Sequence, residues 1–138
     1  MAKHMLYNVS LVVNSVDLSD HVETASIIVK TNKLDAAAMS ELEDYSMPGT
    51  KAVSDPTVTF YQDLAAAKVY ATIYAVWTAR TTFNLVGKVD AGANAATNPA
   101  WTIPVFVAEM PFLTGKRGDR HMAPVTFAVA GVISVATS

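Results

Sequence analysis

Cysteine is absent from the 138-residue chain, and charged residues make up only 16% of it. The absence of thiols excludes a disulfide-bonded scaffold and a thiolate metal site. Ten lysine and arginine residues against 12 aspartate and glutamate residues exclude a strongly basic nucleic-acid binder. Hydrophobic types make up 51%, which excludes a disordered tail. A single domain of this length leaves part of that apolar surface outside its core, and we expect partner molecules to cover it.

The hydropathy pattern of the sequence also shows no targeting signal and no membrane-spanning segment. The most apolar stretch, Pro124–Ala136, is interrupted by Thr126, Gly131 and Ser134. It is too short to cross a bilayer as a helix. We therefore expect no membrane partner.

The residues form no catalytic or metal-binding pattern. His4, His21 and His121 lie far apart and lack the spacing of metal ligands. No Gly-x-Ser-x-Gly elbow, phosphate-cradling glycine loop or dinucleotide fingerprint occurs. We predict that the protein is not an enzyme, and we assign no catalytic residues, no cofactor and no metal.

Alternation of apolar and polar residues predicts six β-strands, mostly antiparallel. The first two, Leu6–Asn14 and Val22–Lys30, are expected to form a hairpin after the turn Asn14–Asp17. Pro104 cannot donate to a strand ladder and so marks an edge or a bulge, while Gly131 predicts a bend within the last strand. The other predicted strands are Thr57–Gln62, Thr81–Val89, Trp101–Ala108 and Ala123–Val135.

One helix is predicted, at about residues 64–79, because Val69, Ile73, Val76 and Trp77 recur on one helical face, which we expect to pack on the core. Asp63 is expected to cap its start. The resulting fold class is mainly β: an antiparallel β-sandwich or small barrel with one packed α-helix and a long protruding loop. We expect one domain over residues 1–138.

The long loop is the segment Thr31–Ser54, which fits neither pattern. One interpretation is a short helix, Asp35–Tyr45, folded back on its own core. The other is an arm that docks on a neighbouring copy, where methionine and tyrosine are favoured. The apolar residues that this second interpretation assigns to the contact are Leu34, Met39, Leu42, Tyr45 and Met47.

Charge changes sign along the chain, since the part up to Asp63 is net acidic and the part after it is net basic. One interpretation is ordinary solvated surface charge. The other is head-to-tail complementarity between copies. The residues proposed for such a charged contact are Glu41, Glu43, Asp44, Lys116, Arg117 and Arg120.

Several segments are similar to a known family. The run Val13–Val22 resembles the opening hairpin of major tail tube proteins of long, non-contractile-tailed bacteriophages (siphophages), especially those of actinobacterial hosts, although Ser15 stands where glycine is commoner. The run Val58–Asp63 before an alanine-rich helix resembles the family's strand-to-helix junction. Thr97–Pro99 and Pro124–Phe127 are similar too, and the match follows the chain in order.

The resemblance implies a structural virion protein whose hexameric rings stack into the phage tail tube, the conduit for DNA ejection. The implied partners are further copies of the chain, the tape-measure protein and transiting double-stranded DNA in the lumen, and tail terminator and baseplate or tip proteins at the ends. The implied location is the virion, after synthesis and assembly in the host cytoplasm. The alternatives are another virion component, such as a tail terminator, connector or capsid decoration protein, or a small-molecule-binding β-barrel.

Overall fold

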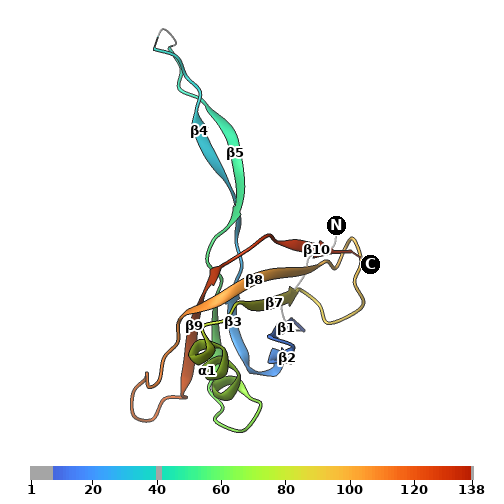
Figure 1. Cartoon of the computed structure of the whole chain (residues 1–138), viewed down its shortest axis with the longest axis vertical. Helices are drawn as coiled ribbons and strands as arrows, with labels where there is room; N and C mark the ends of the chain where they lie inside the picture. Colours follow the sequence, from blue (N-terminus) through green and yellow to red (C-terminus); the bar gives the residue numbers. More distant parts are fainter. Residues whose placement is uncertain (1–7, 40–41, 138) are drawn as a thin grey trace.

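The computed structural model describes residues 8–39 and 42–137. One sheet has the strand order β2-β1-β7-β8-β9-β6-β3, with β10 also paired to β8 (Figure 1). Every pairing in this sheet is antiparallel, and the predicted mainly β fold class is confirmed. Its strands are β1 (Ser10–Val13), β2 (Val16–Asp17), β3 (Val22–Ser26), β6 (Thr57–Tyr61), β7 (Phe83–Lys88), β8 (Ala100–Glu109), β9 (Met122–Val129) and β10 (Ser134–Ala136).

The first turn forms as predicted, but the predicted hairpin of the first two strands is wrong. Asn14 and Ser15 have φ of 48° and 68°, so β1 turns tightly into the short β2. A 3₁₀ turn, Ser19–His21, then carries the chain away, and β3 pairs with β6 rather than with β1. The second predicted strand accordingly divides into β3 and β4 (Val29–Asp35). Of the first predicted strand, residues 6 and 7 lie outside the described residues.

The helix α1 spans Val69–Ala79 and so starts later than predicted. The Asp63 side chain does not cap it, although the Asp63 carbonyl accepts the N–H of Tyr70 in the first turn at 3.1 Å. The Asp63 carboxylate instead accepts the N–H of Ala65 at 2.9 Å, which closes a turn before the helix. Ala67 in the same turn has φ of 60°, which is incompatible with continuing an α-helix. The strong helix propensity of the alanines is therefore overridden by this turn.

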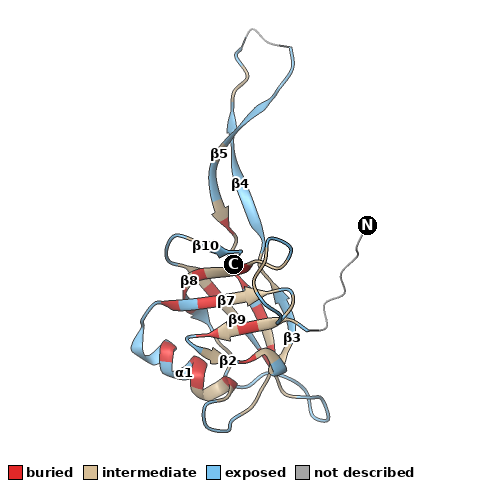
Figure 2. Ribbon diagram, turned by 90° about the vertical axis from the view of Figure 1, so that its right-hand side faces the viewer, coloured by how far each residue is buried: buried red, intermediate tan, exposed pale blue. Residues whose placement is uncertain are grey.

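The core lies between α1 and the face of the sheet that α1 covers, and Figure 2 shows the buried residues concentrated there. Alternate residues of β1, β6, β7, β8 and β9 enter it, as the two-residue period requires. The rings of Phe83 and Phe127 meet edge to face, with their centroids 5.9 Å apart. The largest fully buried side chains are Phe60, Phe127, Leu11, Leu18, Ile73, Leu85 and Ile103.

The bend expected at Gly131 separates β9 from β10, and both strands lie along the same edge of β8. Pro104 of β8 faces this break: its carbonyl accepts the N–H of Ala130 at 2.8 Å, and as a proline it has no N–H to donate in return. A proline in a central strand is tolerated because the neighbouring strand is interrupted there.

The segment predicted as a long loop is a two-stranded β-ribbon that protrudes from the body (Figure 1). Its strands are β4 and β5 (Ser46–Val53), and the alternative helix Asp35–Tyr45 is wrong. We call this ribbon with its connecting tip the arm. The strands lack a burial period because both faces of the arm are exposed.

A bulge shapes the arm, since the pairing shifts between Thr31 and Lys33. Asn32 lies in the bulge and its amide donates to the Thr50 hydroxyl at 2.8 Å. A Cβ on Gly49 would lie 2.8 Å from the Asn32 carbonyl oxygen, so the backbones approach here more closely than another residue allows.

Candidate assembly surfaces

The arm presents all five predicted apolar contact residues to solvent. Leu34 and Met47 are direct cross-strand partners, with exposed fractions of 55% and 54%. Tyr45 is also exposed, and its carbonyl accepts the N–H of Ala36 at 3.1 Å. Met39 and Leu42 at the tip are fully exposed. The arm therefore carries an apolar surface that its own domain does not cover.

Acidic residues accompany this apolar surface at the tip. Glu43 and Asp44 are exposed beside Leu42, and the Asp35 carboxylate accepts the N–H of Ala37 at 3.1 Å. Glu41, the remaining acidic residue of the predicted contact, lies outside the described residues. The tip is thus both apolar and negatively charged.

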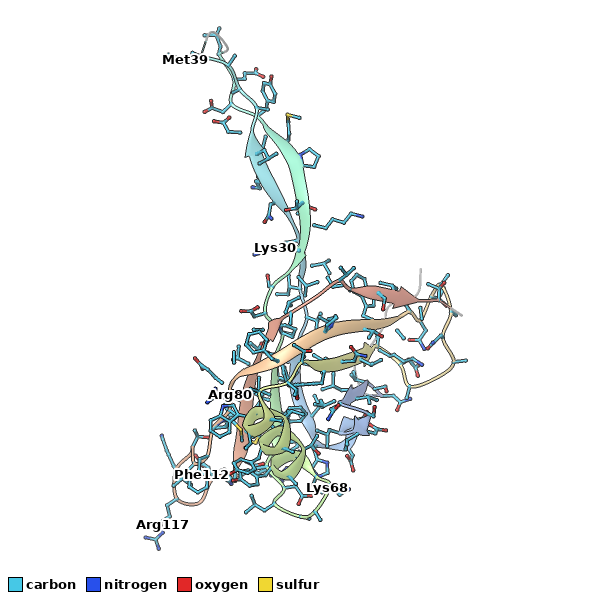
Figure 3. All side chains as sticks on the ribbon, viewed as in Figure 1. Lys30, Met39, Lys68, Arg80, Phe112 and Arg117 are labelled. Atoms are coloured by element: carbon cyan, nitrogen blue, oxygen red, sulfur yellow. The ribbon has the colours of Figure 1, made fainter. Side chains whose placement is uncertain are left out.

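The opposite end of the molecule carries the basic residues of the predicted contact. Lys116, Arg117 and Arg120 lie in the segment between β8 and β9 together with Phe112 and Leu113, which are 77% and 78% exposed. Figure 3 shows Met39 at one end of the molecule and Phe112 and Arg117 at the other. The described acidic residues of the predicted contact, Glu43 and Asp44, therefore lie at one end of the subunit, and the basic residues lie at the other.

Arg120 has a partner within its own subunit. Its guanidinium carbon lies 4.9 Å from the centroid of the Tyr61 ring, within the range of a cation–π contact. Arg120 is therefore held against the body at the root of the basic segment. Lys116 and Arg117 are exposed.

A hollow lies beside the C-terminal end of α1, and we call it the α1 groove. It has a volume of about 650 Å³. The helix ends at Arg80, whose φ of 55° turns the chain toward β7. The exposed rings of Tyr74 and Trp77 form a stripe on the helix, with centroids 6.0 Å apart. The residues that line the groove include Val76, Trp77, Arg80, Thr81, Thr82 and Phe106.

The two ends of the sheet order are β2 and β3, which leave strand edges unpaired among the described strands. A second groove of about 700 Å³ lies between β3 and the β1–β7 pair, lined by residues that include Val22, Ile27, Lys88 and Trp101. Unpaired edges of this kind template pairing with another chain.

The sheet face that points away from the core carries few charges. Its residues in the four strands β6, β7, β8 and β9 alternate with the buried ones. They are threonine, proline, alanine and other uncharged types, apart from Lys88 and Glu109 at the strand ends. Arg120, from the segment between β8 and β9, adds a cation beside Tyr61. The residues of this face away from those ends are Thr57, Thr59, Tyr61, Asn84, Val86, Thr102, Pro104, Ala108, Met122, Pro124, Thr126 and Ala128. Phe106 alternates with the buried residues of β8 too, but it lines the α1 groove at the rim of the sheet.

The ion pairs of the described residues centre on His21, which lies 2.7 Å from Asp20 and 2.9 Å from Asp63. Burial of the ring lowers the pKa of His21, but the hydrogen bonds and charges of both carboxylates outweigh burial and raise it. Hydrogen bonding to His21 lowers the pKa of Asp20. The pKa of Asp63 is lowered first by the N–H of Ala65 and then by His21.

This cluster has no metal-site geometry. Within residues 8–39 and 42–137, no three His, Cys, Asp or Glu side chains are placed to hold a metal ion. The described helices include none long and apolar enough to span a membrane.

No family model and no curated protein matches the chain. Solved structures do match. A chain of the "virion of native gene transfer agent (GTA) particle" superposes with a TM-score of 0.71 at 7% identity, covering 94% of this chain and 95% of that one. A chain of the extended "PVC sheath/tube terminator" of an extracellular contractile injection system gives 0.69 at 11% identity, covering 99% and 98%.

A third match is a chain of the "anti-feeding prophage cap (AFP tube terminating cap)", with a TM-score of 0.65 at 11% identity, covering 100% of this chain and 93% of that one. The chain has a fold found in tail and tube assemblies. At these identities the likeness concerns the fold alone. The three assemblies include tube-terminating components as well as the body of a particle.

The sequence reasoning missed the α1 groove and the apolar pair Phe112–Leu113. The groove joins residues of α1 to Phe106 of β8, which lie far apart in the chain, so no local pattern predicts it. The sequence does contain a signal for Phe112 and Leu113, because two large apolar residues follow Pro111 in an otherwise polar turn.

Proposed function

We propose that the chain is a structural subunit of a phage-type tail tube, in which hexameric rings stack and enclose a conduit for DNA. The fold likeness to chains of gene transfer agent and injection-system particles supports a role in such an assembly. Rings would join through the unpaired edges of β2 and β3, which pairing with a neighbour would satisfy.

The observation that carries the proposal is the polarity of the subunit. One end is an exposed arm whose tip combines Met39 and Leu42 with Glu43 and Asp44. The other end combines exposed apolar residues with Lys116 and Arg117. Two surfaces that are complementary in charge and both apolar, placed at opposite ends, favour head-to-tail contact between copies. Such a heterologous contact repeats without closing, which is what a stack of rings requires.

The sheet face that points away from the core, which carries few charges, supports the conduit. We assign it to the lumen, where the tape-measure protein and then double-stranded DNA would pass. A wall of threonine, proline and alanine side chains releases no counterions from the DNA and so holds it weakly. Virion location, assembly in the host cytoplasm, and terminator and tip proteins at the tube ends follow from the same proposal.

Negative-stain electron microscopy of the purified protein tests the proposal. Long tubes of stacked rings are expected at raised protein concentration. A second candidate, a tube terminator, is favoured by the likeness to terminator and cap chains. A terminator would give single rings that do not stack. Monomers at every concentration would contradict both functions.

A further inference from the structure

The α1 groove is a hollow with apolar walls and one cation at its rim. Trp77 and Phe106 contribute exposed aromatic surface to its lining, 49% and 42% exposed respectively, and Val76 is buried beneath. Arg80 also lines the groove and forms no ion pair with any residue that the structure describes. A guanidinium beside aromatic surface favours a ligand that is apolar and carries a carboxylate.

The arm tip has that chemistry. Met39 and Leu42 are fully exposed, and Glu43 and Asp44 follow directly. Methionine is unbranched and flexible, so it fills irregular hollows well. The tip and the groove are therefore complementary in polarity and charge.

The tip cannot reach the groove of its own subunit. The seven residues of β4, at about 3.3 Å per residue, carry the tip roughly 20 Å out from the body. Figure 3 shows Met39 and Arg80 separated by the length of the arm and much of the body. An arm tip that occupies the groove must come from a second copy.

The protruding pair Phe112–Leu113 is a poorer seat. Its side chains are 77% and 78% exposed and stand out from the body, so they cannot enclose a tip that also stands out. A concave groove covers more of an inserted side chain than a protruding pair does, and burial of apolar area is what stabilises such a contact.

We propose that the α1 groove is the seat for the arm tip of a second copy, with Met39 and Leu42 between Trp77 and Phe106 and the tip carboxylates beside Arg80. This inference rests on the proposed function and adds the receiving site to it. The basic segment between β8 and β9 then steers the acidic tip toward the groove without enclosing it.

Introduced thiols test the seat directly, because the chain contains no cysteine. The double variant L42C/T82C places one thiol at the tip and one in the groove. Oxidation of its assembled tubes should give a ladder of covalent oligomers on a non-reducing gel. Each single variant should give no product beyond a dimer. The matched variant L42C/L113C, with the second thiol on the protruding pair, should give at most one tenth as much ladder.

The outcomes separate the seat from the function. If tubes form and L42C/L113C cross-links while L42C/T82C does not, the proposed binding of the tip in the α1 groove is wrong. The proposal that the subunits stack into tubes would be unaffected. Tubes with neither ladder would also overturn the seat. A wild-type chain that never forms tubes would overturn the proposed function itself.

A charge-reversal cycle provides a second measurement if a thiol variant fails to assemble. R80E keeps a Cβ at the left-handed position, as in wild type, so the substitution introduces no new clash of a Cβ with the backbone there. R80E should lower the polymer fraction at least tenfold, and D44R should restore it in the R80E background. D44R should not rescue R117E. Rescue of R117E alone, or of neither variant, would contradict the seat.

Discussion

Nε2 of His21 lies 2.9 Å from Oδ2 of Asp63, although the two residues are 42 positions apart in the chain. The contact joins the start of β3 to the turn between β6 and α1. Asp20 approaches the other ring nitrogen at 2.7 Å, and the charge of Lys68 acts on both carboxylates. The pair therefore links two parts of the fold through groups that titrate.

We predict a pH-dependent contribution of this contact to stability. The raised pKa of His21 means that its contribution is complete below the ordinary value of 6.5 and is lost as pH rises through the folded-state value. The lowered pKa values of Asp20 and Asp63 mean that theirs is present above 3.8 and is lost as pH falls. Wild type should therefore exceed H21Q in Tm by a few degrees at about pH 5–6.

Thermal unfolding followed by circular dichroism at three pH values measures this difference. It should shrink as the pH rises to about 8, where the imidazole is largely neutral. A Tm difference that is the same at pH 5 and pH 8 would show that the contact acts through packing and not through charge.

A second prediction separates folding of the subunit from stacking. Asp35 and Ser46 form the last ladder pair of the arm, so residues 36–45 can be replaced by Asn-Gly, which closes a two-residue hairpin. The Tm should stay within about 2 °C of wild type, because none of the replaced residues that the structure describes is buried. Tubes should be absent by negative-stain microscopy.

The substitution pair M39S/L42S is the matched control of full length. It keeps the tip and its acidic residues but removes most of the exposed apolar surface. This variant should also form fewer tubes than wild type by negative-stain microscopy. Normal tubes from the shortened arm would refute a role for the tip in assembly.

Sequence periodicity succeeded where one face of a strand is buried. In β6 and β8, the alternation of apolar and polar residues predicts which side chains are buried, as for Val58 and Phe60. The ends of β6, β7 and β8 fall within two residues of prediction. The pairing of β3 with β6 was missed because it depends on contacts distant in sequence. The sequence of the short polar turn before β3 does not indicate which strand β3 pairs with.

The contact surfaces were predicted only in part, for the same reason. Met39 and Leu42 stand out because apolar residues interrupt a polar segment, although nothing in that segment indicated a ribbon. Trp77 looked like one more residue of the helical core face, yet it is 49% exposed beside the α1 groove. Which apolar residues stay uncovered depends on how the helix is seated on the sheet.

A third prediction concerns salt. If opposite charges at the two ends drive stacking, the polymer fraction in sedimentation should fall as sodium chloride rises from 0.1 to 1 M, since the screening length shrinks from about 10 to about 3 Å. Chloride is preferred because sulfate would strengthen the apolar part of the contact. Salt-indifferent assembly would leave the apolar residues as the main contributors.

The final prediction concerns the break between β9 and β10. A Cβ on Gly131 would lie 3.1 Å from both Cβ and Cγ of Pro104, and the proline ring, held in a central strand, has little freedom to retreat. G131A should therefore lower the free energy of unfolding by about 1 kcal/mol, because overpacking outweighs the loss of glycine entropy in the unfolded chain. In a P104A background the clash is gone, and G131A should be neutral or stabilising. Urea unfolding of the four proteins gives the coupling energy; additive effects would show that Gly131 is required for its backbone and not for its contact with Pro104.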